Sequence, residues 1–214
     1  MNPLNRTKTF GAKLFPYVPW TAIAVAMVCT ILAVNGIWRV HVFPDPSFIQ
    51  VVLNPFYYVS NMFVHSDWAH YSGNVQLWLP FAAVLAWLTS DKHVLAIAVT
   101  ANVLATVIAL AMGQIGFGLS STVLAVAAAT LVRSTGYAMQ NASTETLQAA
   151  VAGALVPVAG AFLFIFVLAG GSTNIGHFHH FLGFLFGGAI EIMYVLGERE
   201  REDRVRDIPR GIGR

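Results

Sequence analysis

Six apolar segments dominate this 214-residue chain, and most have the length of a helix that crosses a lipid bilayer. Such a helix needs about 20 predominantly apolar residues. Only 10% of the residues are charged and 57% are hydrophobic, whereas about 25% of the residues of an ordinary soluble domain are charged. The segments are 18–37, 68–88, 94–112, 119–132 or further, 147–168 and 178–196. We therefore predict an all-α, polytopic membrane protein, a bundle of six transmembrane helices, with no second, soluble domain.

The basic residues predict how the chain is oriented. If the N-terminus is cytoplasmic, Arg39 is the one residue among 12 Lys and Arg residues that lies outside. Basic residues concentrate in cytoplasmic segments, so this distribution favours six crossings of the cell membrane with both termini in the cytoplasm. We expect a cytoplasmic tail at 1–17, a membrane domain at 18–197 and a charged tail at 198–214. The first apolar segment lacks a clear cleavage site, so we interpret it as a retained helix rather than a signal peptide.

Polar side chains begin three of the apolar segments. With the orientation above, the second, fourth and sixth segments all run from the outside inward. His70 and Asn74 lie in the first two turns of the second segment, and Ser120 begins the fourth. The sixth begins with three histidines, His177, His179 and His180. At a rise of about 1.5 Å per residue, all these side chains lie at similar depth near the outer surface. Polar groups inside a membrane are costly and usually functional, so we predict a functional site there that opens to the outer side.

The fourth segment provides a further indication of where Ser120 lies. Between Leu119 and Arg133 it spans roughly 22 Å, which is short for a hydrocarbon core of about 30 Å. The glycine-rich segment 113–118 precedes it and is expected to dip into the membrane. Irregular backbone at that depth must be surrounded by protein or water. We therefore expect Ser120 to lie below the surface in a hydrated cavity.

These side chains can form a Ser–His catalytic dyad. A serine hydroxyl is a poor nucleophile unless a base takes its proton, and no Asp or Glu lies at an outer helix end as a third member. Ser120 would be the nucleophile, and His180 would be the general base and then the general acid. His70 and Asn74 share a helix face and, with the backbone N–H of Ser120, are candidates to stabilise an oxyanion.

Each of these residues also has an ordinary structural explanation. A serine at a helix start is usually an N-cap, and glycines four residues apart, such as Gly183 and Gly187, usually allow close helix packing. Glu191 is interpreted as an interfacial residue near the inner end of the last segment. The three histidines of the sixth segment could instead bind a metal or haem.

Together, the three polar groups resemble the rhomboid family of intramembrane serine proteases. The segment His65–Asn74 is similar to the pattern H-x4-H-x3-N that begins the second helix of that family. Gly118-Leu119-Ser120 is similar to its G-x-S nucleophile motif, and residues 180–187 are similar to its H-x2-G-x3-G motif. The motifs occur in the family's order, and the resemblance covers residues 18–196.

The resemblance implies a serine endopeptidase that hydrolyses peptide bonds in or near transmembrane segments of membrane proteins within the lipid bilayer. It implies a Ser120–His180 dyad, assisted by His70 and Asn74, with no metal, cofactor or nucleic acid. The fifth segment, broken by Pro157, would correspond to a lateral gate for the substrate. Supporting roles are implied for His65, Gly118, Leu119, Gly183 and Gly187.

The chain also departs from the family pattern. Ser121 follows the predicted nucleophile where the family usually has glycine, and Leu124 stands where an aromatic residue is common. A Trp-Arg pair typical of the first loop is absent near the second helix, where Phe56-Tyr57 stands. These differences concern the level of activity and the preferred substrate rather than the fold.

Two other functions are compatible with a polytopic chain. One is an inactive rhomboid-like protein that binds transmembrane clients, although such proteins typically lose the serine or the histidine, and this chain has both. The other is a transporter or a metal- or haem-binding membrane protein, but no inverted repeat supports it.

Overall fold

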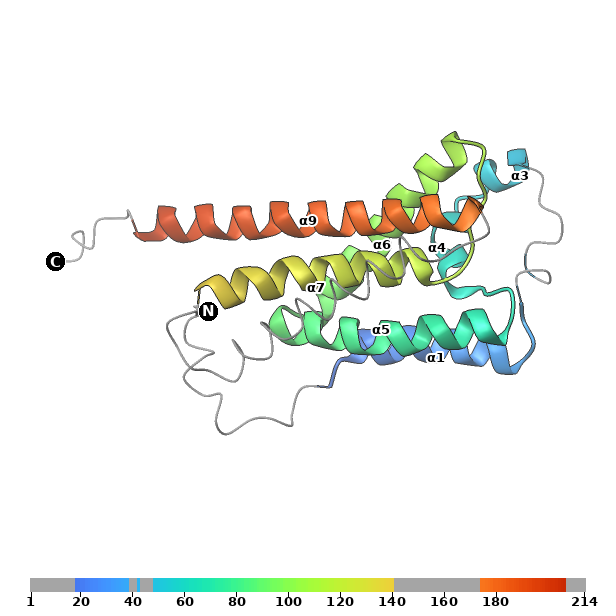
Figure 1. Cartoon of the computed structure of the whole chain (residues 1–214), viewed down its shortest axis with the longest axis horizontal. Helices are drawn as coiled ribbons and strands as arrows, with labels where there is room; N and C mark the ends of the chain where they lie inside the picture. The colour runs from blue at the N-terminus through green and yellow to red at the C-terminus, as the bar shows by residue number, and fades with distance from the viewer. Residues whose placement is uncertain (1–17, 39–41, 43–47, 141–173, 207–214) are drawn as a thin grey trace.

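The computed structural model describes residues 18–38, 42, 48–140 and 174–206 (Figure 1). Every regular element in these ranges is a helix, so the prediction of an all-α chain is confirmed for them. The predicted fifth segment, 147–168, lies outside the described residues. The long helices are α1 (Trp20–Val34), α5 (Trp68–Leu88), α6 (Asp91–Ala111), α7 (Ser120–Gln140) and α9 (Asn174–Arg206).

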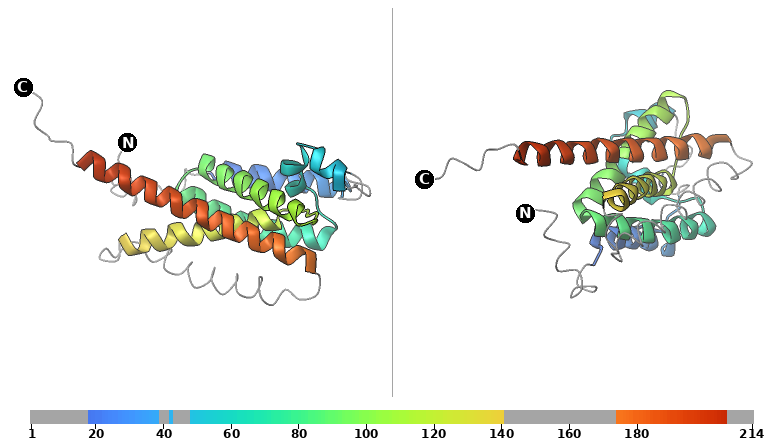
Figure 2. Two further views of the ribbon diagram at one scale, coloured as in Figure 1. Left: turned by 90° about the horizontal axis from the view of Figure 1, so that it is seen from above. Right: turned by 60° about the vertical axis from the view of Figure 1, so that its left-hand side comes forward.

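The connection between α1 and α5 contains short helices. In its described part these are α3 (Phe48–Leu53), α4 (Tyr57–Ser60) and the 3₁₀-helix η3 (Asn61–Phe63). Helices α5, α7 and α9 all begin at the same end of the molecule, and α1 and α6 run the opposite way (Figures 1 and 2). The residues that begin α5, α7 and α9 are therefore gathered at one end.

Side-chain caps determine where two of the long helices begin. The carboxylate of Asp67 accepts a hydrogen bond from the backbone N–H of His70 at 2.8 Å, at the start of α5, so the expectation that no acidic residue lies at this end of a helix is wrong. The hydroxyl of Ser90 accepts one from the N–H of His93 at 3.2 Å, at the start of α6. Both caps satisfy N–H groups that have no partner within the helix.

Helix α7 is the centre of the bundle. It packs against α5, α6 and α9, and every residue from Leu119 to Thr130 is buried. The contact with α9 is a direct backbone contact, because a Cβ atom added to Gly183 would lie 2.2 Å from the carbonyl oxygen of Ser121. The same is true of Gly187 and the carbonyl oxygen of Ala125, also at 2.2 Å. The two glycines therefore act as the packing device that their spacing predicts.

One predicted helix length and one predicted helix end are wrong. Helix α7 continues to Gln140, as the prediction of 119–132 or further allows, but it has 21 residues, about 32 Å, so the expectation that this helix is short is wrong. Helix α9 continues past 196 to Arg206, so the predicted tail begins as helix. In both places the helix continues although the sequence becomes more polar, so a fall in hydropathy alone does not mark the end of a helix.

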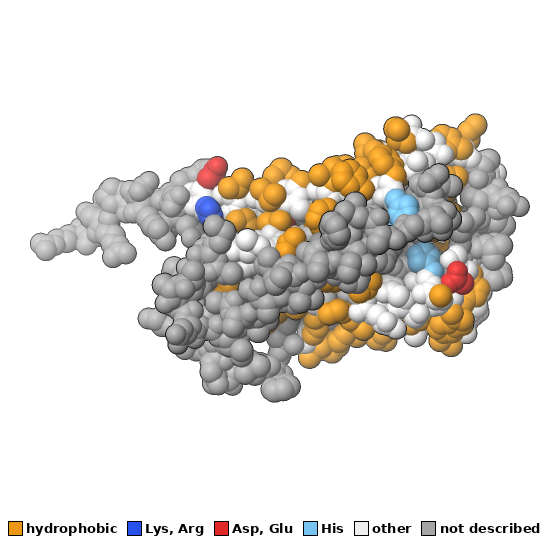
Figure 3. All heavy atoms as spheres, in the orientation of Figure 1, with side chains coloured by type: hydrophobic (Ala, Val, Ile, Leu, Met, Phe, Trp, Pro, Cys, Tyr) orange, Lys and Arg blue, Asp and Glu red, His pale blue; other side chains and the backbone are white. Residues whose placement is uncertain are grey.

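The surface supports association with a membrane. Among the described residues, the helices Asp91–Ala111 and His177–Arg201 are long and apolar enough to cross one, and Trp20–Val34 is a shorter apolar helix. Large hydrophobic side chains are exposed, including Ile31 at 56% and Met193 at 64%. Hydrophobic atoms cover much of the described surface on the face shown in Figure 3. Six crossings and their orientation stay predictions.

Candidate active site

The structure brings together the serine and the histidine of the predicted dyad. Ser120 is the first residue of α7 and is 4% exposed. Its Oγ lies 2.6 Å from Nε2 of His180, in the second turn of α9. This is within the distance at which a general base can take the hydroxyl proton.

His70 and Asn74 lie against the backbone just before the serine. A Cβ atom added to Gly118 would lie 2.9 Å from Nε2 of His70 and 3.6 Å from Nδ2 of Asn74. Gly118 also has a φ of +100°, which side-chain-bearing residues rarely adopt. Only glycine therefore fits here, and its small size lets both side chains approach within two residues of Ser120.

Asn74 carries an unused hydrogen-bond donor. The residue is 4% exposed, and its Nδ2 has no hydrogen-bond partner among the residues that the structure describes. A buried donor without an acceptor is unusual and calls for an explanation. A site for transient negative charge beside Ser120 would supply the missing acceptor.

His65 supports the loop that leads into α7. It is buried, and its Nε2 accepts a long hydrogen bond, 3.5 Å, from the backbone N–H of Leu119. Burial lowers the pKa of His65 to about 4, with a smaller contribution from the neighbouring His70. The imidazole is therefore neutral at pH 7 and can act as an acceptor.

The other two histidines of α9 occupy different positions. His179 is buried, and its Nε2 lies 3.4 Å from Oγ1 of Thr106 on α6. A Cβ atom added to Gly116 would lie 2.5 Å from His179 Nδ1, so the imidazole of His179 packs directly against the backbone of the segment 113–118 that precedes α7. The ring of His177 lies 6.4 Å from that of His180, centre to centre. In the part of the chain that the structure describes, no three His, Cys, Asp or Glu side chains are grouped as metal ligands.

A buried polar network behind Ser120 was not predicted from the sequence. Its centre is Asn102 of α6, which is 1% exposed. The amide of Asn102 contacts the α4–η3 segment on one side and the first turn of α7 on the other. A polar residue in the middle of an apolar segment was the available signal, because such residues are rarely left without a partner.

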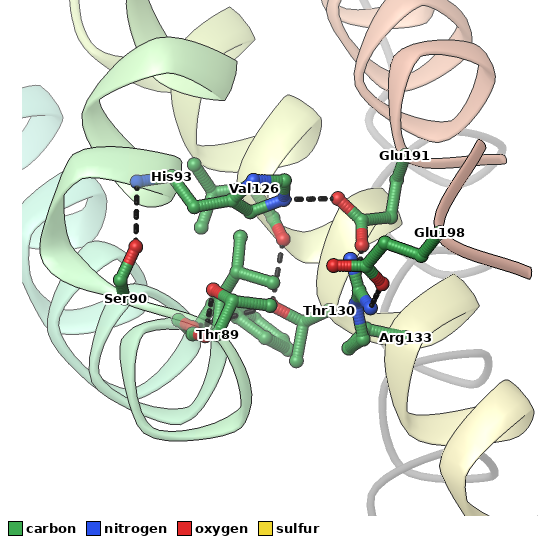
Figure 4. Close-up of polar contacts among 10 residues, drawn as sticks. Thr89, Ser90, His93, Val126, Thr130, Arg133, Glu191 and Glu198 are labelled. Carbon is green, nitrogen blue, oxygen red and sulfur yellow. Dashed lines mark hydrogen bonds and ion pairs between the residues drawn. The ribbon is translucent and has the colours of Figure 1, made fainter. Parts of the chain in front are cut away.

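A second polar cluster lies toward the opposite end of α7, and it corrects the interpretation of Glu191 as an interfacial residue. The side chain of Glu191 is 0% exposed and lies between α6 and α7 (Figure 4). One carboxylate oxygen is 2.5 Å from Nε2 of His93, and the other accepts from Nε of Arg133 at 2.5 Å. Arg133 also donates to the half-exposed Glu198. Glu191 is buried because two partners on neighbouring helices satisfy its charge.

Comparison of the chain with protein-family models and with curated proteins gave no match.

Proposed function

We propose that this protein is an intramembrane serine protease of the rhomboid type that hydrolyses peptide bonds in or near the transmembrane segments of other membrane proteins. The observation that carries the proposal is the 2.6 Å distance between Ser120 Oγ and His180 Nε2. The two residues come from different helices, and they meet at the end of the bundle where α5, α7 and α9 begin.

The proposed chemistry follows from the positions of the side chains. Neutral His180 takes the proton of the Ser120 hydroxyl as its oxygen attacks the carbonyl carbon of the scissile bond. The peptide nitrogen then leaves with that proton, donated by His180, and water hydrolyses the acyl-enzyme by the same route. Nδ2 of Asn74, which has no hydrogen-bond partner in the described part of the chain, is available to donate to the oxyanion, and His70 lies beside it.

The proposal includes a multi-pass topology in the cell membrane. The chain would cross six times, with 147–168 supplying the fifth crossing and the dyad near the outer surface. Two observations support it: the apolar helices α6 and α9, and the charged cluster at Arg133, Glu191 and Glu198, toward the opposite end of the bundle from the dyad. That cluster lies toward the C-terminal end of α9, which the proposed topology places on the cytoplasmic side.

A fluorophosphonate probe tests the proposal on detergent-solubilised protein. We expect the wild type to be labelled, and Ser120→Ala and His180→Ala to lose the label because one removes the nucleophile and the other its base. Ser72→Ala is the matched control, since it makes the same change on α5, where the hydroxyl donates to the carbonyl of Ala69 in its own helix. It should be labelled like the wild type.

Cleavage of a transmembrane substrate in proteoliposomes completes the test. A panel of single-span proteins reconstituted with the wild type should yield fragments that are absent with Ser120→Ala. A folded wild type that is neither labelled nor cleaves any member of the panel would argue against a protease and favour a client-binding protein. Labelling that persists in Ser120→Ala would place the nucleophile elsewhere.

A further inference from the structure

The side chain of Asn102 uses its full hydrogen-bonding capacity. A carboxamide has two N–H donors and an oxygen that accepts two hydrogen bonds. Nδ2 donates to the carbonyl of Tyr58 at 3.0 Å and to Oδ1 of Asn61 at 2.9 Å. Oδ1 accepts from the hydroxyls of Ser121 at 3.2 Å and Thr122 at 3.3 Å. Asn102 therefore joins the α4–η3 segment to the two residues that directly follow Ser120.

The segment that Asn102 holds in turn fixes the backbone on the other side of the serine. The N–H of Gly118 donates to the backbone carbonyl of Asn61 at 2.9 Å. Ser120 thus lies between a residue fixed by the backbone of Asn61 and two residues fixed by the amide of Asn102. The hydroxyls of Ser121 and Thr122 are buried, so they have no water to replace these bonds.

We propose that Asn102 is a positioning residue for Ser120. Its four hydrogen bonds go to Tyr58, Asn61, Ser121 and Thr122. It fixes the first turn of α7 relative to the preceding loop, and this keeps Ser120 Oγ within hydrogen-bond distance of Nε2 of His180. The expected effect on catalysis rests on the proposed function, whereas the effect on the Ser120–His180 hydrogen bond does not.

The first test is the rate at which a fluorophosphonate labels Asn102→Ala. Displacing a reacting group by about 1 Å can cost a factor of about 100, so we expect the maximal labelling rate to fall roughly 10–100-fold. The probe concentration at half-maximal rate should change little, because Asn102 is 1% exposed and the probe has little access to it. A loss confined to probe binding would contradict a positioning role.

Thr130→Val is the matched control. Thr130 is also buried, and its hydroxyl donates to the carbonyls of Phe81 on α5 and Val126 on α7. It lies ten residues after Ser120 on the same helix, about 15 Å away. The substitution removes buried hydrogen bonds of α7 without touching its first turn, so labelling of the folded variant should stay within about twofold of the wild type. A loss as large as that of Asn102→Ala would mean that general loosening of α7 explains both.

The second test reads the hydrogen bond itself and needs no activity. The ¹⁵N resonance of His180 Nε2 is measured in protein with labelled histidine, and Ser120→Ala gives the position of the resonance without the serine. We expect Asn102→Ala to shift the resonance most of the way to the Ser120→Ala position, and Thr130→Val to leave it unchanged. A folded Asn102→Ala with the wild-type resonance overturns the inference.

The two measurements separate the inference from the proposed function. If the wild type is not labelled but Asn102→Ala still shifts the His180 resonance, the protease proposal fails and the positioning role stands. If Asn102→Ala does not fold, the double variant Ser121→Ala/Thr122→Val decides by the same criteria. That variant removes the two hydroxyls on α7 and keeps the hydrogen bonds that Nδ2 of Asn102 donates to Tyr58 and Asn61.

Discussion

The buried carboxylate of Glu191 should contribute strongly to the stability of the bundle. Its side chain is 0% exposed and joins α9 to His93 on α6 and to Arg133 on α7. Glu191→Ala leaves the guanidinium of Arg133, 14% exposed, without its buried partner. Removing one member of a buried ion pair costs about 3–5 kcal/mol, because the remaining charge stays desolvated. We expect a loss of that size in the free energy of unfolding.

Glu198→Ala provides the matched comparison, because Glu198 pairs with the same guanidinium. The side chain of Glu198 is 48% exposed, and water can replace it around Arg133. An exposed pair contributes about 0–1 kcal/mol. The two variants should therefore differ by at least about 2 kcal/mol, which is more than tenfold in the folding equilibrium. Two features account for the difference: Glu191 is buried whereas Glu198 is 48% exposed, and Glu191 also pairs with His93.

The assay is reversible unfolding in mixed micelles with a denaturing detergent, followed by circular dichroism. Glu191→Leu/Arg133→Leu is measured as well, because removing both charges should recover most of the stability that Glu191→Ala loses. Equal losses for Glu191→Ala and Glu198→Ala would refute the reasoning. So would a double variant less stable than Glu191→Ala, since the cost could then not come from an unpaired charge.

Two further predictions concern His65 and the packing of α9. Burial lowers the pKa of His65 from 6.5 to about 4, so the unfolded chain binds a proton first as the pH falls, and this residue reduces stability progressively below pH 6.5. From pH 7 to pH 5, His65 alone should lower the free energy of unfolding by about 2 kcal/mol. In unfolding titrations over this pH range, the free energy of unfolding of His65→Phe should therefore fall less than that of the wild type, and an identical fall would contradict this. Gly183→Ala should cost about 1–3 kcal/mol, because its Cβ would lie 2.2 Å from the carbonyl oxygen of Ser121. Gly188→Ala is the control and should cost nothing, because among the described residues its Cβ would meet Ala128 Cβ at an ordinary 3.7 Å. Equal effects of the two substitutions on the unfolding midpoint would contradict the packing argument.

The sequence was sufficient to predict which residues gather at one end of the bundle. Alternating helix direction places the starts of the second, fourth and sixth apolar segments together, whatever the details of packing. The polar residues at those starts, Ser120 and His180 among them, are therefore expected at the same end, whereas the contact between Ser120 Oγ and His180 Nε2 also depends on how α7 and α9 pack. The bounds of α5 were also predicted correctly, because the capping residue Asp67 and the polar residues after Leu88 delimit it.

Other helix ends could not be predicted from hydropathy. Helix α7 continues through polar residues after Arg133, and the hydroxyl of Thr135 is satisfied by the carbonyl of Leu131 at 2.8 Å, within the same helix. A polar side chain that bonds its own helix gives no signal in the sequence that the helix has ended. The polar network of Asn102 was missed for a related reason. Its partners lie on three separate segments, and their meeting depends on how the helices are rotated.

The rotation of α9, however, can be derived from the glycine pair. Gly183 and Gly187 contact the backbone of α7 directly, so the line of residues through them must face α7. His180 lies three residues before Gly183, and Glu191 lies four residues after Gly187, which places both on that line. One face of α9 thus brings His180 to Ser120 at one end and Glu191 to Arg133 toward the other. The two glycines link the Ser120–His180 contact to the stability of the bundle, because a shift that separates α9 from α7 at either glycine changes both.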